Sequence, residues 1–203
     1  VGKSTAANYV ATKTNAFYVQ VKSTYTKKAF AQALLREMSI PAPTTLSDMM
    51  ELASAELAKS GRPLIIDEFD HLVNSSKVEI VRDLYEASQG TFLIIGEELL
   101  ARKLEKWERF HGRVLNWVPA LPADLHDAMQ LSQIYAPNIE VDVSVIESLV
   151  STVRGSTRRV STNLEMLHEQ ALENGVKHVG LKELALILPN GFVTGESPKP
   201  RSF

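Results

Sequence analysis

Cysteine is absent from the sequence, and its absence excludes several kinds of chemistry at once. A chain without cysteine has no disulfide, no cysteine zinc site and no thiol nucleophile. Proteins that fold without disulfides are typical of reducing compartments, so we expect a cytoplasmic protein. No apolar run approaches the roughly 18 to 20 residues that cross a membrane, and the opening residues lack the pattern of a secretory signal peptide.

An excess of charge of either sign is also absent. The 203 residues include 22 Lys and Arg and 24 Asp and Glu, which gives a formal net charge of -2. A protein that coats nucleic acid with its whole surface is more basic, so any nucleic-acid contact must use a local patch. The composition, 44% hydrophobic and 23% charged, excludes disorder as an overall description.

In the first part of the chain, short apolar strands alternate with helical segments. Runs rich in apolar and β-branched residues predict strands at residues 16–21, 64–66, 91–95 and 114–118. Helical periodicity between them predicts helices at residues 4–14, 27–38, 46–59, 76–88 and 97–107, with a capping box of Ser76 and Glu79. Runs that are apolar throughout are typical of strands buried on both faces. The alternation therefore predicts a doubly wound, parallel α/β sheet.

After Pro119 the pattern becomes helical. We expect helices at residues 122–135, 144–154, 157–174 and 181–186, with a brief extension at 177–179. The predicted organisation is an α/β core at 1–120, a small helical subdomain at 121–188 and a flexible tail at 189–203. The tail carries three prolines and two glycines, which favour fraying.

The first motif with a chemical meaning is Gly2-Lys3-Ser4-Thr5, which opens a predicted helix and is followed by a strand. It matches the end of the phosphate-binding loop G-x-x-x-x-G-K-[ST]. In that loop Gly2 lets the backbone approach phosphates, Lys3 reaches the β- and γ-phosphates, and Ser4 offers a hydroxyl to Mg²⁺. Since the match starts inside the motif, we expect the first strand and the start of the loop to be missing. The alternative is an ordinary helix start with a serine cap.

The second motif is the apolar run Leu64-Ile65-Ile66 that ends in Asp67-Glu68. At the end of a buried strand, Asp67 can hold the Mg²⁺ shell, directly or through water. Glu68 can orient and deprotonate an attacking water. The alternative is a strand end with two solvated acids. The order of the two motifs along the chain favours a site for ATP and Mg²⁺.

With these motifs in place, the chain resembles an AAA+ ATPase up to about residue 188. The resemblance rests on GKST, LIIDE, a strand that ends in Gly-polar, an arginine-bearing segment and Gly-x-x-Arg-Arg before a helix. Within that superfamily it looks most like DNA-transposition ATPases of the phage Mu B type and their TniB and ExeA relatives. Three stretches carry this likeness, at residues 92–97, 109–114 and 155–160. The implied fold is a parallel P-loop NTPase sheet flanked by helices, with a C-terminal helical lid.

The resemblance also implies roles for arginines. Arg113, with Arg109 as the next choice, corresponds to the finger that enters a neighbouring subunit's nucleotide site. Arg158 corresponds to the residue that reports the γ-phosphate to the lid, while Arg159 is free to pair with an acid. The alternative for the basic stretch around Arg113 is a solvated helix face.

The position called sensor 1, after the strand at 91–95, departs from the family pattern. There a polar side chain usually contacts the γ-phosphate or the attacking water, but this sequence offers Glu97. A carboxylate beside phosphate is repelled unless it is protonated or faces away. The alternative is that Glu97 caps the helix that follows.

Three lysines, Lys22, Lys27 and Lys28, flank a Ser-Thr-Tyr-Thr segment after the first predicted strand. By resemblance, this loop holds DNA phosphates, and lysines with hydroxyls suit binding that does not depend on base sequence. The alternative is a set of cap residues with exposed lysines.

The function expected from the resemblance is an ATP-dependent, sequence-non-specific DNA-binding ATPase of transposition, in the cytoplasm of a bacterial host. It is expected to assemble on DNA as a ring or filament, to select target DNA and to activate a transposase. One alternative is an ExeA-like or signalling ATPase that acts on protein partners without DNA. Another is a nucleotide-binding scaffold that hydrolyses ATP poorly.

Overall fold

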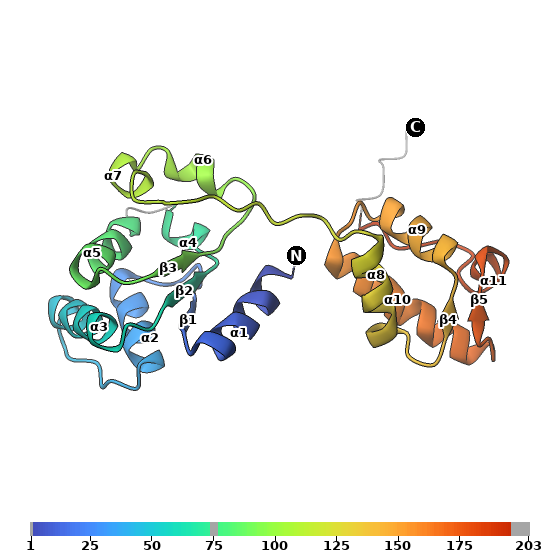
Figure 1. The fold of residues 1–203 in the computed structure, drawn as a ribbon, viewed down its shortest axis with the longest axis horizontal. Coiled ribbons are helices and arrows are strands. Elements are labelled where there is room, and N and C mark those ends of the chain that lie inside the picture. The colour runs from blue at the N-terminus through green and yellow to red at the C-terminus, as the bar shows by residue number, and fades with distance from the viewer. Residues whose placement is uncertain (1, 74–76, 196–203) are drawn as a thin grey trace. The chain divides into compact units, whose positions relative to one another are not determined.

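The computed structural model describes residues 2–73 and 77–195, and the chain divides into two compact units (Figure 1). The first unit comprises Lys3–Pro119 and the second begins at Ala120. Among the described residues, no helix combines the length and the apolar character needed to cross a membrane.

A parallel sheet with the strand order β1-β2-β3 forms the centre of the first unit. The elements follow the chain as α1 (Lys3–Thr14), β1 (Phe17–Gln20), α2 (Lys27–Glu37), α3 (Leu46–Ser60), β2 (Leu64–Asp67), α4 (Asp70–Val73), α5 (Val78–Ser88), β3 (Phe92–Ile94), α6 (Leu100–Leu104) and α7 (Glu108–His111). Helices and strands alternate as the apolar pattern predicts. The predicted α/β class with a parallel, helix-flanked sheet is therefore confirmed.

The two faces of this sheet are covered differently, as Figure 1 shows for α1 on one side and α3 and α5 on the other. Val19 and Ile66 belong to the large core that includes residues of α2, α3 and α5. Ile65 packs instead with two alanines of α1, Ala7 and Ala11, whose small side chains allow a close approach. Because alternate residues of a strand point to opposite faces, Asp67 shares the α1 face with Ile65.

The start of α2 and both ends of α3 follow the sequence signals. The hydroxyl of Thr26 accepts the N–H of Ala29 at the start of α2, and that of Thr45 accepts the N–H of Asp48 at the start of α3. Gly61 ends α3 with a left-handed φ of 63°. The capping box expected at Ser76 lies outside the described residues.

Two predicted elements differ from the structure. The strand expected at 114–118 has no strand partner among the described residues, and Leu115 and Val118 are 99% and 83% exposed. An apolar run becomes a strand only beside a neighbouring strand that accepts its backbone hydrogen bonds. The helix expected at 97–107 is also shorter, since α6 begins at Leu100 and the chain turns before α7.

The second unit is mainly helical, as expected. Its elements are α8 (Leu125–Tyr135), β4 (Glu140–Val141), α9 (Val143–Thr152), α10 (Thr157–Glu173), β5 (His178–Val179) and α11 (Leu181–Ile187). Ile146, Leu149 and Leu164 are fully or almost fully buried between α8, α9 and α10. The sequence indicated the extension at β5 but not its partner β4, which spans only two residues.

The described part of the expected flexible tail is attached to the second unit. The side-chain oxygen of Asn163 accepts the N–H of Val193 at 2.7 Å, and its amide donates to the carbonyl of Val193 at 3.0 Å. Phe192 packs against the cores of this unit. A buried asparagine that satisfies the backbone in this way holds an extended segment in place without a strand partner.

Candidate nucleotide-binding site

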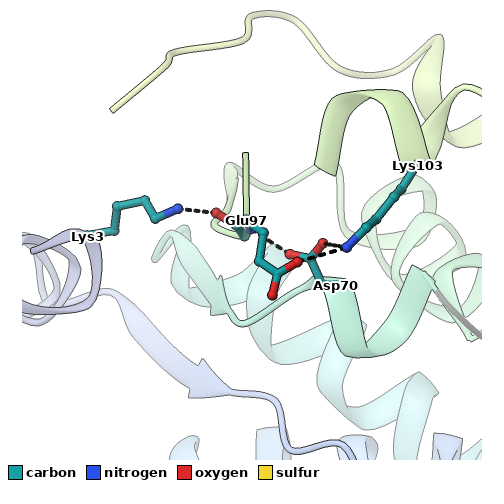
Figure 2. A network of polar contacts seen from close by, with 5 residues as sticks. Lys3, Asp70, Glu97 and Lys103 are labelled. Atoms are coloured by element: carbon teal, nitrogen blue, oxygen red, sulfur yellow. Dashed lines mark hydrogen bonds and ion pairs between the residues drawn. The ribbon is translucent and has the colours of Figure 1, made fainter. Parts of the chain in front are cut away.

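Lys3 is the first residue of α1, and its amino group donates a hydrogen bond to the carbonyl of Gly96, just after β3 (Figure 2). Gly2, before it, has a φ of 90°, a conformation that glycine adopts readily. Ser4 and Thr5 complete the first turn of α1, where backbone N–H groups have no helical partner. The GKST motif therefore lies at a helix start beside the carboxyl end of β3, as a phosphate loop requires.

Asp67 is the last residue of β2 and is 2% exposed. Its Oδ1 accepts the N–H of Glu68 at 2.9 Å, and its Oδ2 accepts the hydroxyl of Tyr18 at 2.8 Å. Burial and, next, the hydrogen bond to Asp67 raise the pKa of Tyr18 to about 12, while the nearby side chain of Asn8 acts in the opposite direction. The tyrosine is therefore a proton donor to Asp67 at neutral pH.

Glu68 has an unusual backbone for a residue with a side chain, with a left-handed φ of 56°. Such a conformation costs about 1–2 kcal/mol. The turn is held on its far side because the N–H of Phe69 donates to the carbonyl of Ile95 at 2.9 Å. Strain of this kind is typical of functional turns, where the surrounding structure fixes it.

Asp70, Glu97 and Lys103 form a network beside Lys3 (Figure 2). The Oδ2 of Asp70 accepts the N–H of Glu97 at 2.7 Å. The amino group of Lys103 donates to Asp70 at 2.7 Å and to Glu97 at 2.9 Å. The hydrogen bond to Asp70, and then that to Glu97, raise the pKa of Lys103.

This network corrects the expectation for Glu97. Helix α6 begins at Leu100, its N-cap is Leu99, and no side chain caps it, so Glu97 is not a helix cap. Its carboxylate pairs with Lys103 instead. The lysine supplies a positive charge that offsets the charge of this carboxylate.

The arginines expected to act as the finger and in the lid lie in different surroundings. Arg113 pairs with Glu86 of α5 and donates to the carbonyl of Arg109, with its side chain 41% exposed. Arg158 is exposed on α10 of the second unit and forms no ion pair with the residues that the structure describes. The guanidinium of Arg159 lies against the backbone at Gly195.

The lysines expected to hold DNA are all exposed, but their surroundings differ. Lys27 lines a hollow of about 590 Å³, in which Glu51, Glu79 and Asp83 also lie. Lys77, which the sequence did not single out, donates from its amino group to the carbonyl of Tyr25 in the same loop.

Sequence reasoning missed Tyr18, Asp70 and Lys103. Tyr18 lies on the α1 face of β1, and Asp70 follows Asp67-Glu68 by two residues, but neither position has a motif of its own. Among residues 2–73 and 77–195, no cluster of three or more His, Asp or Glu could enclose a metal. Mg²⁺ bound with a nucleotide needs only one or two protein oxygens besides phosphates and water, and Ser4 and Asp67 offer that donor set.

Comparison with known proteins identifies the family of the chain. The profile of the AAA domain family matches residues 1–104. No curated protein sequence matches the chain. Among solved structures, Cdc6p of Pyrobaculum aerophilum superposes with a TM-score of 0.61 at 14% identity, over 94% of this chain and 58% of that chain.

RuvB of Thermotoga maritima, described as a Holliday junction branch migration motor, superposes with a TM-score of 0.53 at 14% identity, over 93% of this chain and 67% of that chain. The chain thus spans little more than half the length of Cdc6p and two thirds of RuvB. At this identity the likenesses show the fold. Because the family profile covers more than half of its residues, the chain belongs to the AAA domain family.

Proposed function

We propose that the chain is an ATP-dependent, sequence-non-specific DNA-binding ATPase that acts in DNA transposition as a target-DNA selector and transposase activator. The observation that carries the ATP site is the contact between Lys3 and the carbonyl of Gly96. Since β2 and β3 are parallel neighbours, this contact brings the phosphate-loop lysine to the sheet edge where Asp67 and Glu68 follow β2. Transposition is supported by the resemblance of three sequence stretches to Mu B-type ATPases.

Each residue has a separate role in the proposed hydrolysis of ATP. Lys3 exchanges the Gly96 carbonyl for phosphate oxygens, which are stronger partners for an ammonium group. Ser4 and Asp67 would hold Mg²⁺, which when bound would supply Lewis-acid stabilisation of the charge on the phosphate oxygens. Glu68 orients the attacking water and takes its proton.

Assembly completes the site. Arg113 leaves Glu86 and enters the nucleotide site of a neighbouring subunit, and Arg158 joins from the lid. A half-exposed ion pair contributes only about 0–1 kcal/mol, so a γ-phosphate can displace it. This exchange makes a ring or filament depend on ATP.

Lys22, Lys27 and Lys28 bind the phosphates of DNA, with Lys77 adjoining the same loop. We test this with the full protein and two unrelated duplexes, at two salt concentrations, with ATP, ADP or no nucleotide. ATP-dependent binding to both duplexes, weakened by salt, is expected. Binding of DNA is plotted as the logarithm of the binding constant against the logarithm of the salt concentration. Lys22→Ala and Lys28→Ala should each lower the magnitude of this slope by about one. Lys59→Ala, an exposed lysine at the end of α3, is the control. DNA affinity that ignores ATP contradicts the proposal.

A second candidate is an ATPase that acts on a protein partner, and the hollow beside Lys27 favours it. Its wall combines apolar side chains, including Met50 and Leu84, with carboxylates of α3 and α5. Such a surface suits an apolar, cationic peptide better than DNA phosphates. ATP-dependent binding of a protein without any DNA effect would support this candidate.

A third candidate function is a nucleotide-binding scaffold that hydrolyses ATP poorly. It predicts the same rate of ATP turnover for wild type and Glu68→Gln.

A further inference from the structure

Tyr18 is tied to the carboxylate that is to hold Mg²⁺. Its hydroxyl donates to Oδ2 of Asp67 at 2.8 Å, and the N–H of Glu68 donates to Oδ1 at 2.9 Å. Asp67 is 2% exposed, so water has little access to compete for these oxygens. Both oxygens therefore have a defined protein partner, and the plane of the carboxylate is fixed.

The sheet register explains why a tyrosine does this. Gln20 of β1 is the direct neighbour of Asp67, and Tyr18 is the neighbour of Ile65. Tyr18 therefore lies on the same face as Asp67 but two residues back along the strand. A long, rigid side chain is needed to cover that diagonal, and the ring of tyrosine carries its hydroxyl far enough.

Tyr18 also lies near the helix that carries the phosphate loop. The side chain of Asn8 in α1 lies beside the Tyr18 hydroxyl. The amide of Asn8 donates to the carbonyl of Ser4 at 3.0 Å. Asn8 and Tyr18 therefore lie between the first turn of α1 and the carboxylate at the end of β2, which carry the two proposed Mg²⁺ ligands.

We propose that Tyr18 is a positioning residue for the Mg²⁺ site: its hydroxyl holds the Asp67 carboxylate in the orientation that receives the metal. A carboxylate offers about four acceptor positions, so the two bonds to Tyr18 and Glu68 leave others open for Mg²⁺ or its water. Without the hydroxyl, the terminal torsion of aspartate is broad and the carboxylate is free to turn. This inference rests on the proposed nucleotide site.

The test compares ATP affinity with and without Mg²⁺ in the full protein. Calorimetry gives the dissociation constant of ATP in excess EDTA and in excess Mg²⁺ for wild type, Tyr18→Phe and Tyr85→Phe. Tyr85 is the matched control, because its ring packs against Phe92 and its hydroxyl has no hydrogen bond among the described residues. In EDTA, we expect the dissociation constant of ATP for Tyr18→Phe to be within about twofold of the wild-type value. We expect the factor by which Mg²⁺ increases ATP affinity to be about tenfold smaller in Tyr18→Phe than in wild type.

A second pair of variants separates positioning from a structural role. If Tyr18 acts through Asp67, Tyr18→Phe has no further effect on the Mg²⁺-dependent gain in an Asp67→Asn background. The inference is overturned if Mg²⁺ raises the ATP affinity of Tyr18→Phe as much as it raises that of wild type. It is also overturned if Tyr18→Phe loses the same amount of ATP affinity in EDTA and in Mg²⁺. If wild type itself shows no Mg²⁺-dependent ATP binding, the proposed function fails. If wild type shows that binding and Tyr18→Phe is unaffected, only the inference about Tyr18 fails.

Discussion

The amino group of Lys103 lies 2.7 Å from a carboxylate oxygen of Asp70, and this ion pair fixes the loop after β3. The other oxygen of Asp70 accepts the N–H of Glu97, the residue next to the carbonyl that Lys3 contacts. Asp70 is 3% exposed, and a buried carboxylate is costly without a charged partner. The pair therefore supports the loop that Lys3 contacts.

Lys103→Met tests this support. We expect it to lower the free energy of unfolding by about 1–3 kcal/mol, because Asp70 loses its charged donor while it stays buried. Urea unfolding measures the change. Lys59→Met, at an exposed lysine, should stay within about 0.5 kcal/mol of wild type. Equal effects of the two substitutions would refute a supporting role for Lys103.

Gly96→Ala is expected to distort the same loop. A Cβ at Gly96 would overlap Oδ2 of Asp70 and lie 2.8 Å from Cδ2 of Leu100. We expect a loss of about 1–3 kcal/mol, the usual cost of forcing atoms into a packed site. Gly112→Ala is the control, because Gly112 has a φ of -65° and its nearest contact is at 3.4 Å. A thermal unfolding midpoint that is the same in both variants would count against this contact.

Glu68→Gly and Glu68→Ala separate backbone strain from carboxylate chemistry. Both remove the proposed base, so both should abolish ATP hydrolysis. Since φ at this position is 56°, glycine should be more stable than alanine by about 1 kcal/mol. At the exposed Glu165 of α10, the Glu165→Ala variant should instead be more stable than Glu165→Gly by about 1 kcal/mol, because this position is helical. Chemical denaturation of the four variants decides whether the turn is strained.

The stability contributed by the Tyr18 hydroxyl should depend on pH. Its pKa of about 12 in the folded state is above the value of about 10 for an unfolded chain. Its contribution is therefore complete below about pH 10 and is lost as pH rises toward 12. We expect the stability advantage of wild type over Tyr18→Phe to shrink between about pH 10 and about pH 12 in urea unfolding. An advantage that grows over this range would contradict the assignment.

Asn163→Ala should release the segment around Val193. The substitution leaves the backbone N–H and carbonyl of Val193 without their partners, so we expect a loss of about 1–3 kcal/mol. Hydrogen exchange at the amide of Val193 should become faster. Asn174→Ala, an exposed asparagine near the end of α10, should leave that amide unchanged. Unchanged exchange in Asn163→Ala would show that other contacts hold the segment.

Much of the first unit could be predicted from local patterns. The apolar runs at β1, β2 and β3 and the cap residues Thr26 and Gly61 indicate their elements without knowledge of distant contacts. The run at 114–118 has the same local character but forms no strand, because a strand also depends on a partner that local sequence does not specify.

The sequence by itself determined which residue types the proposed site contains: a lysine in a phosphate-loop motif, an acidic pair after a buried strand, and their order along the chain. Only the tertiary structure decided which other residues contact these motif residues and the loop beside them. Tyr18 reaches Asp67 because of the register between β1 and β2, and Lys103 reaches Asp70 and Glu97 because α6 folds back beside α4. Such pairs join residues far apart in the chain. Their partnership depends on packing, since the same tyrosine or lysine on another face would be an ordinary surface residue.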